Sequence, residues 1–399
     1  MTSASAEVGP SGKTLLLVIN EAYFLLSHRR EVVLAAQRAG YRVHVAAPSH
    51  HAWAPESFKL EELEKIGCVA HVIPMSRRGM NPLTEARTFA ALVSLYRRLR
   101  PDVVHHITIK PNLYGGLAAR LTSVPAAVFA VAGLGELFTG KRLATRLARP
   151  FVARALRLAF GHRNARVIVQ NPEDRQRLIG DNLAVPDRIV IIRGSGVDLA
   201  QFRAQPEPDG TPVVLMAARL IWDKGIAEFV EAARLLKRRG VAARCVLVGG
   251  THPTNPRAVP ATRLRAWAAE GVVEWWGFQT DMTKVLPQAH IVCLPSMYGE
   301  GVPKVLLEAA GCARAVVASD IPGCREAVVQ GTTGLLVRPG DSEALADALA
   351  SLLADPARRI AMGMSGRRLV EADFDERKVA AQTLAVYSEL APWARHSRA

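Results

Sequence analysis

Short strand-like runs alternate with helical segments along the chain, and this alternation limits the fold more than any other feature. In the first half the strand-like runs are TLLLVIN (14–20), YRVHVAAP (41–48), VAHVIPM (69–75), DVVHHI (102–107) and AAVFAVAG (126–133). Segments of helical composition, such as TEARTFAALVSLYRRLR (84–100), lie between them. Strands that alternate with helices in this way form a parallel sheet with helices on both faces. The sequence therefore predicts an α/β fold built from doubly wound parallel sheets.

The same pattern restarts in the second half of the chain. PVVLMAA (212–218) reads as a new buried strand, and the segment before it, GSGVDLAQFRAQPEPDG (194–210), is rich in Pro, Gly and acidic residues. At 399 residues the chain is long enough for two domains. We therefore predict one domain over 1–198 and a second over 209–373, joined by a linker.

Two carboxylates flank the start of a predicted helix in the second half. After the strand-like IVCLP (291–295), Glu300 falls in a loop between Gly299 and Gly301, and Glu308 falls inside the helix that follows. A carboxylate only accepts hydrogen bonds, so this pair suits vicinal hydroxyls such as those of a ribose and a hexose. The helix N-terminus beside them attracts a diphosphate. The alternative is a loop charge at Glu300 and a capped or paired surface residue at Glu308.

Two cations bracket a predicted loop near the start of the second domain. VVLMAARLIWDKGIAEFVEAARLLKRRG (213–240) reads as a strand, a short loop and an amphipathic helix, with Arg219 and Lys224 at the ends of the loop. Open α/β sheets bind ligands at the carboxyl ends of their strands, and cations at this spacing can straddle a diphosphate. The alternative is an ion pair of Arg219 with Asp223.

The net charge of +15 indicates an anionic partner. No zinc-finger spacing, RNP-like aromatic motif or basic helix-turn-helix accompanies this charge, so a membrane surface or a phosphorylated lipid is preferred over nucleic acid. No apolar run approaches the roughly 18 residues of a spanning helix, and the N-terminus lacks the basic region of a secretory signal. Five cysteines without CxxC spacing read as free thiols in a reducing cytosol. We expect a cytoplasmic protein that is peripheral on the inner face of the cell membrane.

Residues 137–172 concentrate the basic charge, with eight Lys or Arg and no acidic residue. On a helical projection four arginines group on one side and three apolar residues on another, which is the pattern of an interfacial helix. The arginines are Arg142, Arg146, Arg149 and Arg157, and the apolar residues are Leu147, Phe151 and Leu158. Pro150 interrupts the pattern, so two short helices fit it as well as one. The alternative is a solvated basic face packed on the core.

The order of the candidate donor residues resembles that of retaining glycosyltransferases of the family-4 type, which have the GT-B architecture. The matching positions are Arg219, Lys224, Gly249 with Gly250, Gly277 through Asp281, Glu300, Glu308 and GTTGLLVRPGD (331–341). Four further segments resemble bacterial enzymes that add an N-acetylhexosamine to a polyprenyl-diphosphate-linked sugar. They are SRRGMNP (76–82), VAGLGELF (131–138), GSGVDLAQF (194–202) and VLMAARLIWDKGIAEF (214–229). The resemblance implies two Rossmann-like domains facing across a cleft, with 374–399 folded back to complete the first.

The resemblance also implies a donor site for a UDP-sugar. Arg219 and Lys224 would bind the diphosphate, Glu308 the nucleotide ribose, and Glu300 the donor hexose. The remaining donor-site residues would be Gly301 and Val302 through their amides, Gly249, Gly250, Gly133 and Gly135. Catalysis would be mainly electrostatic, centred on Arg219, Lys224 and Glu300, with the leaving phosphate taking the acceptor proton. As simple turn glycines, Gly133 and Gly135 would look the same in the sequence.

A group of polar residues near the predicted strand 102–107 forms the candidate acceptor site. His105, His106 and Lys110 lie where an open sheet places its ligand. We predict that Lys110 binds the acceptor diphosphate, with His28 and Arg29 at the start of the first helix as helpers.

The resemblance is imperfect on this acceptor side. Many family members have histidines where this chain has Ile107 and Ala132. A catalytic histidine is therefore in doubt, and the alternatives are a hydrogen-bonded core histidine at His105 and a surface residue at Arg29.

Asp373 and Asp375 have a spacing that another glycosyltransferase architecture uses for a metal, but they stand at the start of the helical segment FDERKVAAQTLAVYSELA (374–391). Aspartates in that position are typical N-caps, so we predict no metal. The predicted function is transfer of a sugar, expected to be an N-acetylhexosamine, from a UDP-sugar to a polyprenyl-diphosphate-linked saccharide, without a cofactor. The alternatives are a non-hydrolysing UDP-sugar epimerase of the same architecture and a catalytically silent subunit that binds nucleotide or membrane.

Overall fold

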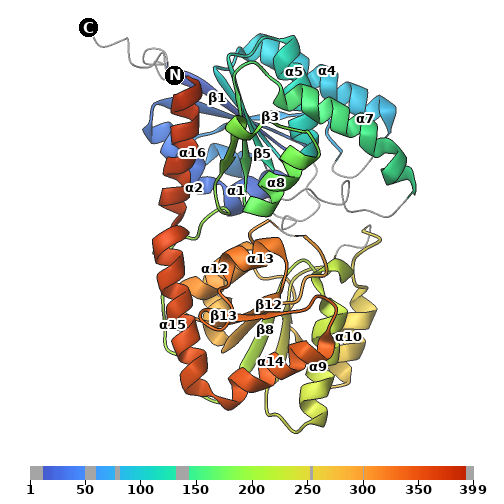
Figure 1. The fold of residues 1–399 in the computed structure, drawn as a ribbon, viewed down its shortest axis with the longest axis vertical. Helices are drawn as coiled ribbons and strands as arrows, with labels where there is room; N and C mark the ends of the chain where they lie inside the picture. Colours follow the sequence, from blue (N-terminus) through green and yellow to red (C-terminus); the bar gives the residue numbers. More distant parts are fainter. Residues whose placement is uncertain are drawn as a thin grey trace, which may run out of the picture.

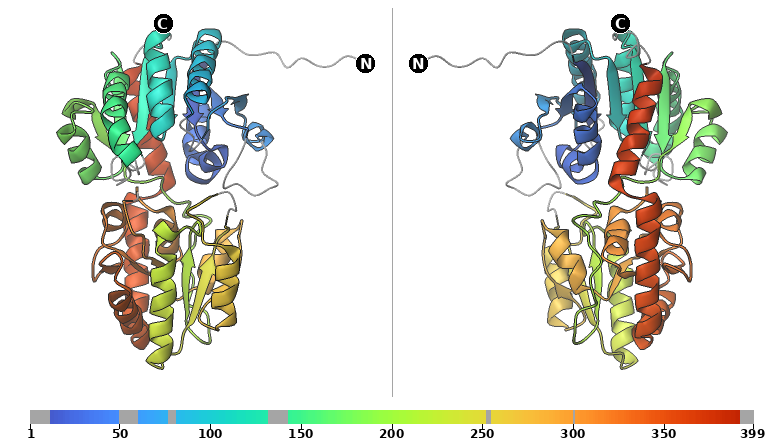
Figure 2. Two further views of the ribbon diagram at one scale, coloured as in Figure 1. Left: turned by 90° about the vertical axis from the view of Figure 1, so that its right-hand side faces the viewer. Right: turned by 90° about the vertical axis from the view of Figure 1, so that its left-hand side faces the viewer.

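A computed structural model describes residues 12–49, 60–76, 81–131, 143–251, 255–299 and 301–391, of which 143–148 are described by their backbone alone. Within these ranges the chain forms two parallel sheets, one in each half, and helices cover both faces of each (Figure 1). The two halves lie end to end, and the views of Figure 2 show them meeting over a narrow waist. The predicted pair of doubly wound parallel sheets is therefore confirmed.

The first sheet has seven parallel strands in the order β3-β2-β1-β4-β5-β6-β7. Its strands are β1 (Lys13–Ile19), β2 (Tyr41–Ala47), β3 (Val69–Val72), β4 (Val103–Ile107), β5 (Ala126–Val131), β6 (Ala165–Val169) and β7 (Ile189–Ile191). Its helices are α1 (Ala22–His28), α2 (Arg30–Arg38), α3 (Glu61–Glu64), α4 (Pro82–Leu99), a π-helical turn (Pro111–Gly115), α5 (Gly116–Leu121), α7 (Leu143–Phe160) and α8 (Pro172–Gly180). The strand order reverses between β1 and β4, so the loops after these strands lie side by side.

The second sheet has six parallel strands in the order β10-β9-β8-β11-β12-β13. Its strands are β8 (Val213–Ala217), β9 (Arg244–Val248), β10 (Glu274–Trp275), β11 (Ile291–Leu294), β12 (Ala315–Ser319) and β13 (Gly334–Val337). Its helices are α9 (Ile226–Arg238), α10 (Ala261–Ala269), α11 (Met282–Val285), α12 (Lys304–Gly311), α13 (Pro322–Ala327), α14 (Ser342–Ala354) and α15 (Pro356–Asp373). Here the order reverses between β8 and β11, which brings the loops after these two strands together.

Burial on both faces explains why the strands read as continuous apolar runs rather than alternating ones. Residues 15–19 of β1 are buried, as are all residues of β8, β11 and β12. Parallel sheets covered by helices on both sides require such runs. The five cysteines are all buried, and none of them is in a disulfide.

The chain crosses between the two halves twice, and the two crossings contact each other. Val197 N donates to Phe374 O at 2.8 Å, and Glu376 N donates to Val197 O at 3.2 Å. The last helix, α16 (Glu376–Leu390), then packs on α2 and contributes Tyr387 to the core of the first sheet (Figure 1). Asp375 caps α16 by accepting a hydrogen bond from Arg377 N at 2.8 Å, which confirms the predicted N-cap.

Candidate active site

The loops after β8 and β11 are in direct contact at the switch point of the second sheet. Met297 N donates to Asp223 O at 2.9 Å. Gly225 has φ +78°, and a Cβ at this position would lie 1.9 Å from Pro295 O, so the close approach requires glycine. The contact places the short 3-10 turn Trp222–Lys224, and with it Lys224, beside the loop that leads into α12.

Arg219 and Lys224 belong to a group of cations that gathers around His28 of the first domain. Desolvation lowers the pKa of the half-buried His28 well below its usual range, and four nearby cations lower it further. These cations are Lys304, Arg29, Arg219 and Lys224. We call these four residues the cation cluster. Arg29 comes from the first domain and the other three from the second, so the cluster draws on both sides of the cleft.

Asp223 pairs with another residue than Arg219, the partner that the sequence suggested as an alternative. Its Oδ1 forms an ion pair with Arg257 Nη2. The proposed pair of Arg219 with Asp223 is therefore replaced by a pair within the loops of the second sheet. This leaves the assignment of Arg219 to a ligand diphosphate standing as a prediction.

Glu308 lies in α12 and is largely buried. Burial raises the pKa of Glu308, and the nearby Lys304 lowers it in part. Lys304 Nζ lies 3.5 Å from Glu308 Oε1, and Lys304 also donates to Ser27 O of the first domain. At 3.5 Å this ion pair leaves most of the hydrogen-bonding capacity of the carboxylate to other partners. Glu308 also helps to raise the pKa of Tyr23 in α1, so its charge reaches across the cleft.

The loop before α12 carries the predicted amide donors. Glu300 lies outside the described residues. α12 begins after Pro303 without a side-chain cap, so its first N–H groups are available to a ligand. The amide of Val302, in contrast, donates to Gln170 Oε1 of the first domain at 2.8 Å.

Gly249 and Gly250 hold the end of β9 against the loop after β8. Gly249 has φ +146°, and a Cβ there would lie 2.0 Å from Ala218 O, so no other residue fits. Gly250 O accepts a hydrogen bond from Leu220 N at 3.3 Å. Both glycines therefore support the loop that carries Arg219. Gly133 and Gly135 lie outside the described residues.

The two histidines predicted for the acceptor site are core side chains, which corrects that prediction. His105 is 1% exposed and its Nδ1 lies 2.6 Å from Tyr387 Oη, whereas His106 is 0% exposed and its Nε2 lies 2.9 Å from Tyr96 Oη. The two rings point to opposite faces of the sheet because neighbouring residues of a strand alternate. Both lie inside β4, before the edge at which a ligand would bind.

Lys110 and Arg29 differ in whether their cationic side chains already have partners that an anion would have to displace. Lys110 Nζ lies 2.5 Å from Glu85 Oε1 and 2.8 Å from Ser76 O, so an acceptor diphosphate would compete with a carboxylate. Arg29 is 4% exposed, which excludes the surface alternative, and its Nε has no hydrogen-bond partner among the described residues. A buried guanidinium N–H without an acceptor is costly, so Arg29 is the stronger candidate for binding an anion.

The basic segment forms one continuous helix, α7, although Pro150 lies inside it. Arg142 and the side chain of Arg146 lie outside the described parts. Arg149 Nη2 lies 3.6 Å from Asp181 Oδ2, and Arg157 Nε donates to Asn182 O at 2.5 Å, so these two arginines are tied to the end of α8. The exposed face of α7 carries Phe151, which is 78% exposed, together with Arg154, Arg157 and Leu158.

Two further findings concern membranes and metals. No helix within the described ranges is long and apolar enough to cross a bilayer. Among the same residues, no group of three or more His, Cys, Asp or Glu is arranged to hold a metal ion.

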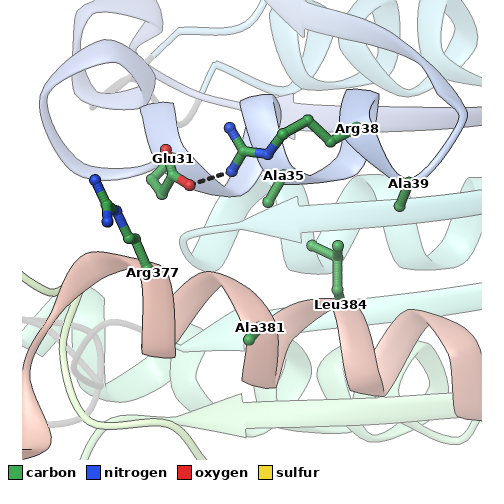
Figure 3. Close-up of a pocket in the computed structure, with 7 residues that line it drawn as sticks. All are labelled: Glu31, Ala35, Arg38, Ala39, Arg377, Ala381 and Leu384. Atoms are coloured by element: carbon green, nitrogen blue, oxygen red, sulfur yellow. Dashed lines mark hydrogen bonds and ion pairs between the residues drawn. The ribbon is translucent and has the colours of Figure 1, made fainter.

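A groove between α2 and α16 is separate from this site. It is lined by Glu31, Ala35, Arg38, Ala39, Arg377, Ala381 and Leu384 (Figure 3). Glu31 and Arg38, which both line the groove from α2, form an ion pair with each other. No strand-end loop contributes to the groove, so it does not belong to the candidate active site.

Sequence reasoning missed Lys304, Gln170 and the contact of Ser27 with α12. Lys304 stands four residues before Glu308, and this i, i+4 spacing of opposite charges was the available signal. The contact between Gln170 and Val302 joins residues 132 positions apart, and no local sequence pattern predicts it.

Two family models match the chain, one in each half. The model for "Glycosyl transferase 4-like" proteins matches residues 14–171, and that for "Glycosyl transferases group 1" matches residues 211–355. A sucrose-phosphate synthase from Thermosynechococcus elongatus superposes with a TM-score of 0.78 and 21% identity, over 96% of this chain and 100% of that one. The Anabaena protein Alr3699/HepE, solved with UDP-glucose, superposes with a TM-score of 0.74 and 19% identity, over 94% of this chain and 99% of that one. The chain therefore belongs to the GT-B glycosyltransferases that combine a 4-like and a group 1 domain.

Relatives of known activity extend over most of the chain. An N,N'-diacetylbacillosaminyl-diphospho-undecaprenol alpha-1,3-N-acetylgalactosaminyltransferase of Campylobacter jejuni is 28% identical over 349 residues, which are 84% of this chain and 90% of the relative. The capsular polysaccharide biosynthesis glycosyltransferase CapM of Staphylococcus aureus is 22% identical, over 80% of this chain and 85% of its own length. The protein is thus an enzyme of the hexosyltransferase class.

Proposed function

We propose that this glycosyltransferase moves an N-acetylhexosamine from a UDP-sugar to a polyprenyl-diphosphate-linked saccharide, with retention of the anomeric configuration. The observation that carries the proposal is the cation cluster, in which Arg29 of the first domain and Arg219, Lys224 and Lys304 of the second all lower the pKa of the half-buried His28. A donor and an acceptor that each carry a diphosphate suit such a cluster. The histidine stays neutral at pH 7 and therefore adds no charge of its own.

The donor would bind at the switch point of the second sheet. Arg219 and Lys224 hold its diphosphate at the loop after β8, where the uncapped start of α12 also favours negative charge. Glu308 accepts hydrogen bonds from the ribose hydroxyls, and Glu300 binds the hexose. Support for a uridine nucleotide comes from the Anabaena neighbour, which was solved with UDP-glucose.

The acceptor would bind from the first domain. Arg29, whose Nε has no partner in the described part of the chain, is the group that we assign to the acceptor diphosphate, next to His28. The Campylobacter relative supports this assignment, because its name specifies an acceptor linked through a diphosphate to undecaprenol and an N-acetylgalactosaminyl donor.

Catalysis in this proposal is electrostatic and needs no metal. Cleavage of the bond between sugar and phosphate leaves negative charge on UDP, and Arg219, Lys224 and the start of α12 stabilise that charge as it grows. His28 is held neutral, with its Nδ1 2.7 Å from Ser27 Oγ and its ring stacked 3.9 Å from Phe24. The leaving phosphate takes the proton of the acceptor hydroxyl.

A lipid-linked acceptor requires access to a membrane, and α7 offers a surface for this. Phe151 and Leu158 are exposed apolar residues beside the exposed Arg154. Exposed apolar groups among cations favour the interface of an anionic bilayer. We therefore place the protein on the cytoplasmic face of the cell membrane as a peripheral enzyme.

Product analysis tests the proposal. The protein is incubated with UDP-glucose, UDP-galactose, UDP-N-acetylglucosamine or UDP-N-acetylgalactosamine, with and without a polyprenyl-diphosphate disaccharide, and the products are identified by mass spectrometry. We expect one N-acetylhexosamine to be added to the lipid-linked saccharide only when both substrates are present. Conversion of a UDP-sugar to its epimer without acceptor, or no reaction with any pair, would contradict the proposal.

A further inference from the structure

Gln170 connects the two domains at the start of α12. It follows β6 directly, is 6% exposed, and its Oε1 accepts the hydrogen bond of 2.8 Å from Val302 N. Because a backbone N–H can only donate, the carboxamide oxygen must face Val302. The orientation of the carboxamide is therefore fixed, and its NH2 group must point to the other side.

The loop before α12 is docked against several elements of the first domain. A Cβ on Gly194, in the segment after β7, would lie 3.1 Å from Val302 Cβ. Lys304 Nζ donates to Ser27 O at the end of α1. Gln170 thus belongs to a set of contacts that fixes the loop relative to the first domain, and it contacts the backbone group predicted to lie at the donor hexose.

The NH2 group of Gln170 has no hydrogen-bond acceptor among the residues that the structure describes. The nitrogen is not one of the fully buried side-chain atoms that lack a partner, so it is open to solvent, and its two N–H donors can bind an acceptor oxygen of a ligand. The proposed function puts the donor hexose beside Val302, and the hydroxyl and acetamido oxygens of that sugar are acceptors of the right kind.

We propose that Gln170 binds the donor hexose. Its oxygen holds the amide of Val302 in place, and its NH2 group donates to a hydroxyl or acetamido oxygen of the sugar. This inference rests on the proposed function, since it takes a UDP-hexose as the donor. The nucleotide itself is bound by Arg219, Lys224 and Glu308, so Gln170 contributes to the affinity for a UDP-hexose and not to the affinity for UDP.

Calorimetric titration with two ligands tests this inference. UDP and the UDP-hexose that the wild-type protein binds best are each titrated into the wild type, Gln170→Ala and Gln170→Glu. Gln170→Ala removes both hydrogen bonds, whereas Gln170→Glu keeps an acceptor for Val302 N but lacks the NH2 group. We expect both variants to lose about 10-fold in affinity for the UDP-hexose and to bind UDP within about 2-fold of wild type.

Arg325→Met is the matched control, because Arg325 Nη1 makes a different cross-domain contact, 3.4 Å from Glu173 Oε1, on the surface. Its affinity for both ligands should equal that of the wild type. Wild-type affinity of Gln170→Glu for the UDP-hexose would reduce Gln170 to a structural link and overturn the inference. A wild-type protein that binds no UDP-sugar would instead defeat the proposed function, and the two failures are therefore distinguishable.

Discussion

Replacing Glu308 by glutamine removes one charge from the candidate donor site and almost nothing else. The side chain keeps its size, and its position in the second turn of α12 is unchanged. In the free protein the carboxylate costs stability, because burial raises its pKa and its ion pair with Lys304 is long, at 3.5 Å. We therefore expect the ligand-free Glu308→Gln protein to melt at the same temperature as the wild type or higher.

The same substitution should weaken binding of the donor, although it does not lower the stability of the free protein. A carboxylate that accepts hydrogen bonds from two ribose hydroxyls contributes about 1.5–3 kcal/mol for each bond to a charged group. A glutamine keeps one acceptor oxygen, so we expect a loss of about 3 kcal/mol, which corresponds to a decrease in kcat/KM for the donor of about 100-fold. The change should appear mainly as weaker binding of UDP, since the ribose is bound equally in the ground state and the transition state.

Two measurements check this prediction together. Thermal unfolding without ligand reports the cost of the buried carboxylate, and steady-state transfer at limiting donor reports kcat/KM. Lower stability of Glu308→Gln without ligand, combined with wild-type kcat/KM and UDP affinity, would show that Glu308 is a structural residue.

Three further predictions follow from other parts of the molecule. Excess EDTA should leave the transfer rate largely unchanged, because cationic side chains take the place of a metal in the proposal, and loss of activity that manganese restores would contradict it. Burial, followed by the charge of Asp198, raises the pKa of Glu376 to about 7, so the folded state binds a proton that the unfolded state has released. Stability should therefore fall as pH rises from about 4.5 to about 7, and Glu376→Gln should reduce this fall in melting temperature, whereas an unchanged pH dependence would refute the assignment. Changing both Phe151 and Leu158 of α7 to Ser should weaken co-sedimentation with phosphatidylglycerol vesicles by at least about 10-fold without changing UDP affinity, and equal binding would remove the membrane assignment.

The sequence predicts the architecture well because its signals are local. Buried parallel strands are continuous apolar runs, and every strand run predicted in the first half overlaps an observed strand. The position of Lys224 at the end of a loop after a strand, and that of Glu308 within a helix, follow from the same patterns.

The parts of the site that the sequence did not predict depend on register and on contacts between distant residues. His105 and His106 lie two residues and one residue before the end of β4 at Ile107. A shift of one residue in register separates a ligand-facing position from the core. The contact of Lys304 with Ser27 joins residues 277 positions apart and exists only when the two domains meet. Its charge and its position after a strand placed Lys110 at the acceptor, and only the structure could show its partner Glu85.

In the proposed function one cation cluster serves two diphosphates, with Arg29 on the acceptor and Arg219 on the donor. Steady-state transfer with both substrates varied, for Arg29→Gln and Arg219→Gln, tests it most directly. We predict that Arg29→Gln raises KM for the lipid-linked acceptor about 10-fold or more with little change in KM for the UDP-sugar. Arg219→Gln should lower kcat and weaken binding of the donor, and it should leave KM for the acceptor nearly unchanged. Equal effects of each variant on both substrates, or no effect of Arg29→Gln on the acceptor, would contradict the account.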